Sequence, residues 1–339
     1  MLRKILVTGG AGFIGSNFTR YILRTYEDIE VVVLDKLTYA GNLDNLKEVE
    51  DNPRYRFVRG DICDEKVVEE VMRGCDCVIN FAAETHVDRS IGDPSSFIMT
   101  DVYGTYVLLE ATRKLGIPKF IQISTDEVYG DAGDTPSSED SPLMPRSPYA
   151  ASKAGGDRLA YSYFTTYGSP VVITRCTNNY GPNQYPEKMV SLFITNAIED
   201  KPLPVYGTGK NTRDWIYVLD HVKALDIIMR TDGLEGEVFN IGSGIELSIL
   251  EVAERILTIL GKPKDLIRMV KDRPGHVFRH AVTTDKIRSR LGWKPEIDFD
   301  TGLKMTIDWY LENRWWWEKI KSGEFKEYYK KMYRELEAK

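Results

Sequence analysis

The sequence is poor in the features that mark secreted or metal-binding proteins. Its 339 residues include four cysteines, Cys63, Cys75, Cys77 and Cys176, which do not make a disulfide framework in a chain of this length. Cys75 and Cys77 are separated by a single residue, a spacing that does not suit zinc ligands. We therefore expect no metal site, and four buried, reduced thiols of the kind found in cytoplasmic proteins.

Long apolar runs and an excess of basic residues are absent too. No stretch approaches the roughly 18 apolar residues that a membrane span needs, and the segment MLRKILVTGG lacks the apolar core of a secretory signal. The net charge is -6 and Lys and Arg are nowhere dense, so we expect neither a nucleic-acid nor a membrane partner. The tryptophans at 315–317 fit a partly buried terminal helix, because no basic amphipathic face surrounds them.

The first half of the chain alternates short apolar runs with helix-length segments. The expected strands are Lys4–Thr8, Val31–Asp35, Arg56–Arg59, Cys77–Ala83, Phe120–Thr125 and Val171–Arg175. The expected helices between them include Ile14–Thr25, Glu65–Met72, Val102–Leu115 and Ala150–Tyr167. Strands that are apolar at consecutive positions are covered on both faces. The alternation therefore predicts an α/β fold with a Rossmann-type doubly wound parallel sheet.

The pattern changes after about Gly181, where proline and glycine become frequent and long helical segments such as Ile249–Leu260 follow. A chain of 339 residues is long enough for two domains. We predict a sheet domain formed by residues 1–181 and 212–243, and a smaller mixed α/β domain formed by residues 182–211 and 244–339.

The segment VTGGAGFIGS joins the first expected strand to the first expected helix. Its glycines Gly9, Gly12 and Gly15 are three residues apart, which lets the backbone turn tightly and approach a pyrophosphate at the helix N-terminus. Asp35 ends the second strand, twenty positions after Gly15. A carboxylate there accepts both ribose hydroxyls and repels a 2′-phosphate, so we predict NAD rather than NADP, although Lys36 is a cation beside it.

Two further positions extend this pattern. Asp61 ends the third strand and is placed to reach the adenine edge. Tyr149 and Lys153 lie four residues apart at the start of an expected helix, so they share a face. A nearby ammonium stabilises the phenolate and lowers the pKa of a tyrosine, which can then remove a proton from a sugar hydroxyl. A pair of this spacing is also common by chance on exposed helices.

Together these motifs resemble the extended short-chain dehydrogenase/reductases, and among them most closely the dTDP-glucose 4,6-dehydratase family, over the full length of the chain. The matching stretches are TGGAGFIGS, DKLTYAGN, AAETHVDRS, STDEVYGD, SPYAASKA, NNYGPNQYPEK, RDWIYVLDH and DRPGH. The resemblance implies a hydro-lyase that uses NAD and turns dTDP-glucose into a 4-keto-6-deoxy sugar. It leaves open whether the product is destined for rhamnose or for another deoxysugar.

The resemblance also implies roles for a catalytic set of five residues. Tyr149, supported by Lys153, is the base during C4 oxidation, and Thr125 hydrogen-bonds the C4 oxygen. Glu127 removes the C5 proton and Asp126 protonates the departing C6 hydroxyl. Two neighbouring carboxylates push their pKa values apart, which suits one acid and one base. Adjacent strand residues face opposite ways, so the backbone must leave the strand at Asp126 for both to reach one sugar.

The remaining positions are carried over from the family motifs. The expected cofactor contacts are Gly9, Gly12, Phe13, Ile14, Gly15, Asp35, Lys36, Leu37, Thr38, Asp61, Ile62, Phe81, Ala82, Ala83, Thr100, Tyr149, Lys153 and Asn179. The expected substrate contacts are Thr85, Thr125, Asn178, Lys188, Met189, Pro204, Tyr206, Arg213, Asn240, Arg273 and His276. Arginine and lysine suit a diphosphate, whereas Pro204 and Tyr206 suit a nucleobase.

One segment departs from the family pattern. After DRPGH the family usually has DRRYA, whereas this chain has VFRHA from Val277 to Ala281, with His280 in place of the tyrosine. We expect this segment to lie at the nucleotide end of the substrate. Because Val277, Phe278 and His280 differ from the family pattern, it stays open whether the nucleobase of the substrate is thymine or uracil. The chemistry at the sugar is expected to be unaffected.

Other functions were weighed against this interpretation. A nucleotide-sugar 4-epimerase would share Gly12, Tyr149 and Lys153 but needs no acid–base pair at C5 and C6. A decarboxylase or a GDP-mannose dehydratase could share Glu127 but usually lacks the preceding aspartate. A non-catalytic NAD-binding protein would typically lose the tyrosine and lysine. The resemblance also implies a homodimer, in which helices like Val102–Leu115 and Ala150–Tyr167 pair into a four-helix interface.

Overall fold

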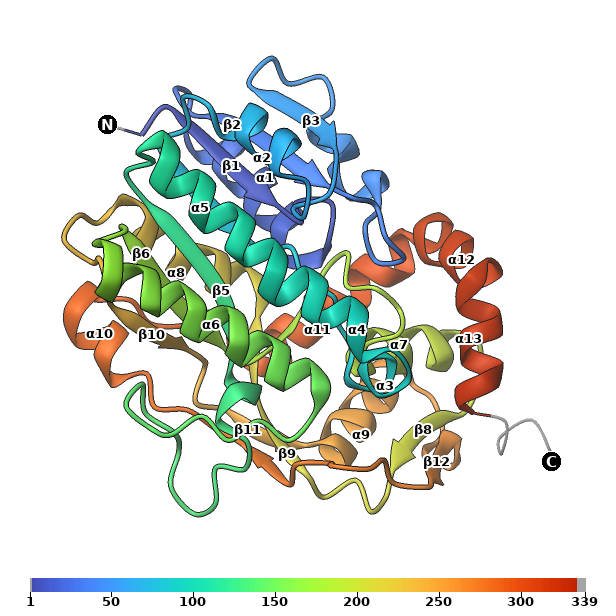
Figure 1. Ribbon diagram of the computed structural model, residues 1–339. Coiled ribbons are helices and arrows are strands. Elements are labelled where there is room, and N and C mark those ends of the chain that lie inside the picture. Colours follow the sequence, from blue (N-terminus) through green and yellow to red (C-terminus); the bar gives the residue numbers. More distant parts are fainter. Residues whose placement is uncertain (1, 334–339) are drawn as a thin grey trace.

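The computed structural model describes residues 2–333 and is built on a seven-stranded parallel sheet with the order β10-β6-β5-β4-β1-β2-β3 (Figure 1). Its strands are β1 (Lys4–Thr8), β2 (Glu30–Asp35), β3 (Tyr55–Arg59), β4 (Cys77–Asn80), β5 (Phe120–Thr125), β6 (Val171–Cys176) and β10 (Val238–Ile241). The doubly wound fold is thus confirmed. β4 ends three residues earlier than predicted, at Asn80, because the next residues leave the sheet.

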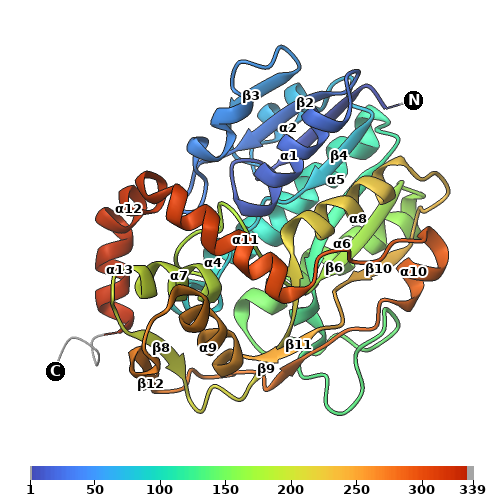
Figure 2. The same ribbon diagram turned by 180° about the vertical axis from the view of Figure 1, so that it is seen from behind.

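Helices cover both faces of this sheet. On one face lie α2 (Glu65–Met72), α5 (Thr105–Leu115) and α6 (Pro148–Tyr167), and on the other lie α1 (Phe13–Thr25) and α8 (Val218–Arg230) (Figures 1 and 2). Side chains alternate along a strand, so Ile5 and Val7 pack towards α1 and α8 while Leu6 packs towards α2 and α5. Both faces are apolar, which explains the consecutive apolar positions in the sequence.

Shorter helical elements lie along the rest of the chain. These are η1 (Leu43–Val49), α3 (Val87–Gly92), α4 (Pro94–Phe97), the π-helix η2 (Ile98–Gly104), the 3-10 helices η3 (Asp126–Tyr129) and η4 (Lys264–Leu266), and α10 (Asp285–Leu291). The predicted helix Val102–Leu115 is therefore a π-helix in its first turn and α-helical only from Thr105.

Two smaller sheets lie beyond the carboxyl ends of the large sheet. One contains β11 (Glu246–Ser248), β9 (Thr212–Tyr217) and β13 (Arg279–His280), with β7 (Asn178–Tyr180) paired to β9; the other pairs β12 (Ile267–Val270) with β8 (Leu203–Tyr206). The helices α7 (Met189–Ile198), α9 (Ile249–Leu260), α11 (Phe299–Glu312), α12 (Arg314–Ser322) and α13 (Glu324–Met332) pack around them (Figure 2).

The C-terminal tryptophans belong to the core of this second part. Trp316 and Trp317 are fully buried in the same cluster as Phe193 and Leu303, whereas Trp315 is half exposed. The interpretation of a partly buried terminal helix is confirmed. None of the helices within residues 2–333 combines the length and the apolar character that crossing a bilayer requires.

Asn45 of η1 ties the two parts together. Its side-chain amide donates to the carbonyl oxygen of Ala11 in the glycine loop at 2.8 Å. Its Oδ1 accepts from Asn183 at 3.2 Å and from the indole Nε1 of Trp316 at 2.9 Å. Because Asn45 is buried, these bonds connect the glycine loop, the segment after β7 and α12 at one point.

All four cysteines are free thiols. Cys75, Cys77 and Cys176 are buried, but Cys63 is only half-buried, so the expectation of four buried thiols was too broad. Burial raises the pKa of Cys63 and of Cys75 to about 11, which keeps both thiols protonated and unreactive at neutral pH.

Candidate active site

Two adjoining cavities lie at the carboxyl ends of the parallel strands. The first has a volume of about 290 Å³ and the second of about 150 Å³. Glu127, Tyr149, Asn178 and Lys188 line both, so the cavities meet at these side chains. In open α/β sheets this edge is where ligands bind, because the helix N-termini and the strand-end loops converge there.

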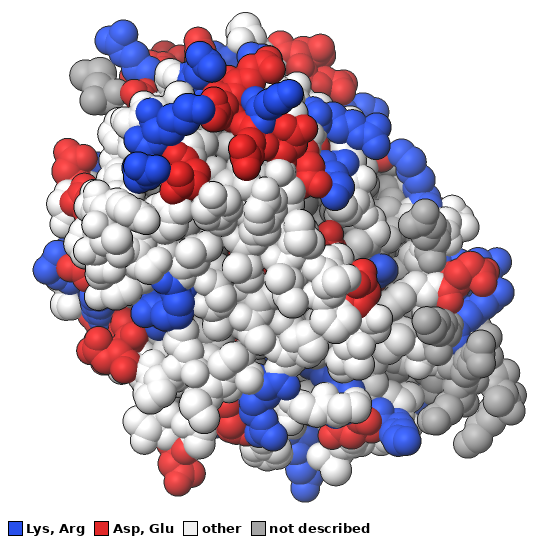
Figure 3. Space-filling view, viewed as in Figure 1, with Lys and Arg blue, Asp and Glu red and all other residues white. Residues whose placement is uncertain are grey.

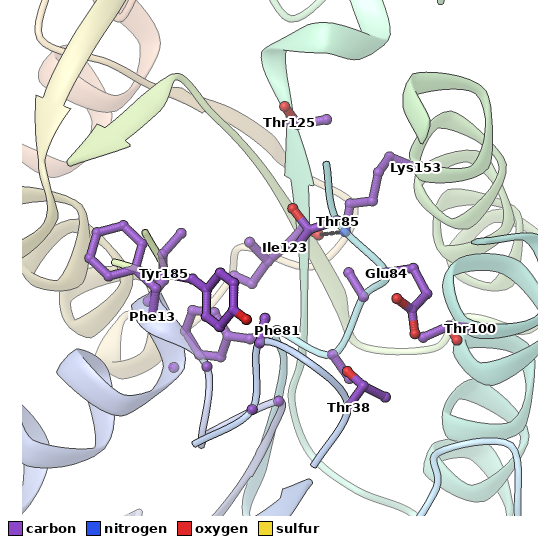
Figure 4. Close-up of a pocket in the computed structure, with 18 of the residues that line it drawn as sticks. Phe13, Thr38, Phe81, Glu84, Thr85, Thr100, Ile123, Thr125, Lys153 and Tyr185 are labelled. Carbon is purple, nitrogen blue, oxygen red and sulfur yellow. Dashed lines mark hydrogen bonds between the residues drawn. The ribbon is translucent and has the colours of Figure 1, made fainter. Parts of the chain in front are cut away.

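The first cavity collects nearly all of the predicted cofactor contacts. Of the eighteen positions expected from the sequence, only Leu37 is missing from its lining. Figure 4 shows the aromatic side chains of Phe13, Phe81 and Tyr185 gathered on one side of this cavity. The lining therefore has an apolar wall and a polar wall, as a ligand with a flat ring and a charged part requires.

The glycine loop at the floor of this cavity has no room for side chains. Gly9 has a φ of 65°, and a Cβ there would lie 2.6 Å from the backbone nitrogen of Ala82. A Cβ on Gly15 would lie 2.5 Å from the carbonyl oxygen of Gly9. The loop thus leads tightly into the N-terminus of α1, where backbone N–H groups are available for an anion. These residues fit the pyrophosphate of a dinucleotide.

Asp35 and Asp61 form the far end of the cavity. The carboxylate of Asp35 accepts from the backbone N–H of Ala11 at 2.9 Å and of Leu37 at 2.8 Å, which fixes its orientation. Lys36 is paired with Asp61 at 2.6 Å. Burial raises the pKa of Asp61, but the ion pair outweighs it and leaves that pKa below its ordinary value. Since Lys36 is already paired, the carboxylates dominate, and they disfavour a 2′-phosphate.

Tyr149 and Lys153 occupy the first turns of α6, which Ser147 caps by accepting from the N–H of Ala150. The ammonium of Lys153 is buried and donates to the carbonyl oxygen of Ile123 at 2.7 Å, the bond drawn in Figure 4. The sequence predicted a lowered pKa for Tyr149, and the structure contradicts this. Burial, followed by the nearby carboxylate of Glu127, raises the pKa of Tyr149 well above its ordinary value.

Asp126 and Glu127 open the 3-10 helix η3, which begins where β5 ends at Thr125. The chain thus leaves the strand at Asp126, as predicted, and both carboxylates line the first cavity. Thr125 Oγ1 accepts from the N–H of Glu127 and donates to Asp126 Oδ1, each at 3.3 Å. Burial, followed by the charge of Glu127, raises the pKa of Asp126 well above its ordinary value. Asp126 is therefore suited to carry a proton at neutral pH.

The second cavity contains most of the predicted substrate contacts. Its lining includes Asn178, Lys188, Met189, Pro204, Tyr206, Arg213, Arg273 and His276, while Thr85 and Thr125 line the first cavity. Lys188 donates to Thr85 Oγ1 at 2.8 Å across the junction. Arg273 lines this cavity, and its buried Nε donor has no acceptor among the described residues. A diphosphate supplies such acceptors.

Asn240 is the predicted substrate contact that the structure places elsewhere. It lies in β10, outside the lining of both cavities, and is fully buried. Its amide donates to the carbonyl oxygens of Ser137 and Thr283, and its Oδ1 accepts from Tyr129. All of its hydrogen-bonding groups are thus used inside the protein, so it holds the loop of Ser137 against the sheet instead of contacting a ligand.

The sequence missed several residues at the junction of the cavities. Glu84, His86, Asp88, Gln184, Tyr185, Glu187, Asn211 and Tyr333 line one cavity or the other. Arg89 donates to Glu187 at 2.9 Å, and its guanidinium stacks 3.6 Å from the ring centroid of Tyr39 and 4.3 Å from that of Tyr328. Most of these residues fall in AAETHVDRS and NNYGPNQYPEK, but the sequence predicted only Ala82, Ala83 and Thr85 from the first stretch and Asn178, Asn179 and Lys188 from the second.

The altered segment after His276 lies only partly where the sequence predicted it. Val277, Phe278 and His280 are absent from the lining of both cavities among the described residues. His280 instead lies beside the acid candidate, with its Nδ1 3.9 Å from Asp126 Oδ2. The reason is the pairing of β13 with β9, which turns the segment back towards η3. His280 therefore bears on the end of the site that holds Asp126, whereas Val277 and Phe278 adjoin Arg213 of the second cavity through their carbonyl oxygens.

Comparison with known proteins agrees with this geometry. The model of the family described as GDP-mannose 4,6 dehydratase matches residues 6–306. A dTDP-glucose 4,6-dehydratase from Streptomyces niveus is 52% identical over 94% of this chain and 96% of its own length. The low-salt glycan biosynthesis protein Agl12 of Haloferax volcanii is also 52% identical, over 91% of this chain and 98% of its own.

The fold of the chain also resembles that of a solved structure. The dTDP-glucose 4,6-dehydratase DesIV from Streptomyces venezuelae, crystallised with NAD and TYD bound, superposes with a TM-score of 0.91 at 47% sequence identity. The match covers 94% of this chain and 99% of that one. The likeness therefore extends over both parts of the fold and both cavities.

Proposed function

Because the chain belongs to the dTDP-glucose 4,6-dehydratase family, we propose that it converts dTDP-glucose into dTDP-4-keto-6-deoxyglucose and water. The observation that carries this proposal is the position of Asp126 and Glu127 on one turn of a cavity that Tyr149 also lines. An acid and a base at one carbohydrate remove water between neighbouring carbons. An epimerase sharing the glycine loop would have no use for the pair.

NAD+, held by residues such as Gly9, Gly12 and Asp35, would supply the hydride acceptor for the oxidation of C4 and, once reduced, the hydride that C6 needs. Tyr149 takes the proton of the C4 hydroxyl, and Thr125 holds the C4 oxygen in place. The ammonium of Lys153 is held by the carbonyl oxygen of Ile123 on the same helix face as Tyr149. Its positive charge stabilises the phenolate of Tyr149 during the transfer of the hydroxyl proton. The ordinary state of Tyr149 is the protonated phenol, so the base forms only in the assembled site.

The oxidation of C4 makes the C5 proton acidic, because it is then adjacent to a carbonyl group. Glu127 removes this proton, and Asp126 gives its own proton to the C6 hydroxyl as it departs as water. The raised pKa of Asp126 keeps that proton available at neutral pH. Glu127 afterwards returns a proton to C5. The proton that Tyr149 took from the C4 hydroxyl replaces, by way of solvent, the one that Asp126 gave, so the sugar ends with one water fewer and all the residues regain their starting state.

The nucleotide end of the substrate is assigned to the second cavity. Lys188, Arg213 and Arg273 bind the diphosphate, and Tyr206 with Pro204 holds the thymine. Arg213 supports this role because it is buried and donates to the carbonyl oxygens of Val277 and Phe278, which fixes its guanidinium. Burial lowers the pKa of Arg213 to about 10, so it remains a cation at neutral pH.

The same proposal covers the organisation and the location of the protein. Residues 1–181 and 212–243 form the NAD-binding domain, and residues 182–211 and 244–339 bind the nucleotide sugar. Two separate hydrophobic clusters on the two sides of the site support a division into two domains. The clusters depart from these bounds in two places: Trp215 and Tyr217 of β9 belong to the second cluster, and Ile287 and Trp293 belong to the first. The four free thiols support a reducing, cytoplasmic location.

The protein is further proposed to be a homodimer that pairs through η2, α5 and α6. The support is an outer face with few charges. Figure 3 shows a broad area without Lys, Arg, Asp or Glu where Figure 1 has α5 and α6. Exposed apolar and aromatic side chains of these elements are Ile98, Met99, Tyr103, Tyr106, Tyr161 and Tyr167. A second copy of the same face would bury them.

The direct test is to incubate the protein, with NAD+, separately with dTDP-glucose, UDP-glucose and GDP-mannose. The 4-keto-6-deoxy product is detected by its strong absorbance in alkali. Product from dTDP-glucose at the highest rate supports the proposal. A 4-epimer without loss of water, or preferred turnover of GDP-mannose, would replace it with the corresponding alternative.

A further inference from the structure

His280 faces Asp126 in the interior of the protein. The Nδ1 atom of His280 lies 3.9 Å from Asp126 Oδ2, and both side chains are only 3% exposed. Neither atom has a hydrogen-bond partner among the described residues. Burying two polar atoms without hydrogen-bond partners lowers the stability of the folded protein. The distance between His280 Nδ1 and Asp126 Oδ2 exceeds the length of a hydrogen bond by about 1 Å. This closeness of two unpaired atoms points to an interaction between them.

The backbone fixes this arrangement from both sides. β13 runs parallel to β9 with His280 opposite Arg213, and the guanidinium of Arg213 binds the carbonyl oxygen of Val277 at 3.0 Å. Asp126 is the first residue of η3, and its other carboxyl oxygen accepts from Thr125. The distance between the side chains of Asp126 and His280 is therefore set by where β5 and β13 end.

The charges around the pair decide where a shared proton resides. Two carboxylates and one arginine act on Asp126, and two arginines and a second imidazole act on His280. These groups are Glu127 of η3, Asp214 and Arg213 of β9, and Arg273 and His276 of the segment before β13, with the thiol of Cys176 of β6 beside Asp126. Arg213 favours a negative Asp126, but burial and the carboxylates of Glu127 and Asp214 outweigh it, and the arginines disfavour a positive His280. A neutral acid beside a neutral imidazole is the favoured state.

We propose that His280 is a positioning residue that accepts a hydrogen bond from protonated Asp126 at Nδ1 and so keeps the acid in its proton-bearing form. The inference rests on the proposed function, because it concerns the acid of that dehydration. His280 transfers no proton: the one that leaves Asp126 goes to the departing hydroxyl, and the imidazole stays neutral. Burial raises the pKa of Asp126 and lowers that of His280, which agrees with this assignment.

The test follows the rate of product formation from dTDP-glucose across pH. Removing the acceptor with His280→Phe destabilises the protonated acid, so the basic limb of the profile should move to lower pH by about one unit. His280→Asn offers an oxygen near the position of Nδ1 and should restore the limb. Phe278→Ala, at an exposed position of the same segment outside both cavities, should leave the limb unchanged.

Two outcomes would overturn the inference. In the first, the basic limb of the pH profile of His280→Phe coincides with that of the natural protein. In the second, the basic limb shifts as far in His280→Asn as in His280→Phe. A double-mutant cycle provides a further check. In a protein that already carries Asp126→Asn, His280→Phe should have no further effect on the pH profile. A structural role for His280 would lower the rate in both backgrounds equally.

An infrared measurement separates this inference from the proposed function and needs no substrate. The difference spectrum between the natural protein and Asp126→Asn should contain the carbonyl band of a protonated carboxyl group at neutral pH. The band should be lost at lower pH in His280→Phe than in the natural protein. A missing band contradicts the inference even if dTDP-glucose is turned over, whereas a band without turnover contradicts the proposed function alone.

Discussion

Asp126 and Glu127 are neighbours in the chain with different surroundings. Asp126 is buried, and one of its carboxyl oxygens has no hydrogen-bond partner within residues 2–333, whereas Glu127 is half-buried and lines both cavities. Two groups of one chemical kind thereby acquire two functions, an acid and a base. The sequence showed the pair, but the difference in burial comes from the change of β5 into η3 and could not be derived from residue type.

Replacing Asp126 with asparagine should stop the reaction after its first step. The variant keeps the size of the side chain but has no proton to give to the C6 hydroxyl. We expect product formation to fall by about 10²–10⁴-fold, the usual contribution of a general acid. C4 oxidation should continue, so NADH absorbance should rise and persist after mixing with dTDP-glucose. Asp134→Asn, at an exposed position, serves as the matched control.

A second residue-scale prediction concerns a buried ion pair away from the cavities. Arg175 binds Asp157 through Nε at 2.8 Å and Nη2 at 3.0 Å, and both side chains are at most 1% exposed. Asp157→Asn leaves a buried guanidinium without its counter-charge. We expect the free energy of unfolding to fall by about 3–5 kcal/mol in denaturant titrations. Asp308→Asn, which breaks the exposed pair with Lys304, should cost less than about 1 kcal/mol.

The same pair predicts how stability depends on pH. Burial raises the pKa of Asp157, but the hydrogen bond and charge of Arg175 outweigh it, and the folded pKa lies below the ordinary value. This contribution is therefore complete above about pH 4 and is lost as the pH falls through the folded pKa. Between pH 7 and the acid range, the natural protein should lose more stability than Asp157→Asn. Equal slopes for both proteins would contradict the assignment.

At the scale of elements, regular segments were predicted well and irregular ones poorly. β1, α2, β5 and α9 have the expected bounds, because their apolar periods are long and uninterrupted. The π-helix η2 and the two small sheets were not predicted. Strands such as β13 contain two residues and pair with a strand more than sixty positions away, so no local pattern announces them. For this reason the position of His280 was assigned to the wrong end of the substrate.

The glycine loop gives a prediction for an element as a whole. In Gly15→Ala the new Cβ would lie 2.5 Å from the carbonyl oxygen of Gly9, so the loop or the start of α1 must shift. We expect the affinity for NAD+, measured by calorimetry, to fall about tenfold or more, equivalent to at least about 1.4 kcal/mol. Gly92→Ala is the control, since a Cβ there meets nothing within 4 Å. Equal affinities in the two variants would contradict the proposed cradle.

At the scale of the whole molecule, the proposed dimer can be tested by one added charge. Tyr161 of α6 is 37% exposed on the face with few charges. Tyr161→Glu would place a carboxylate in the centre of a paired apolar surface, so we expect sedimentation velocity to show monomers where the natural protein shows dimers. Leu311→Glu is the control, at a 42% exposed position of α11, on the other side of the molecule (Figure 2).

The contacts around Asn45 give the protein a built-in optical signal. The indole of Trp316 is joined to Asn45, and Asn45 to the carbonyl of Ala11, so two hydrogen bonds separate a buried fluorophore from the cofactor cradle. Binding of NAD+ at the glycine loop should therefore change the tryptophan fluorescence of the protein, and most of this change should be lost in Trp316→Phe. Cofactor loading could then be followed in real time without touching the catalytic groups.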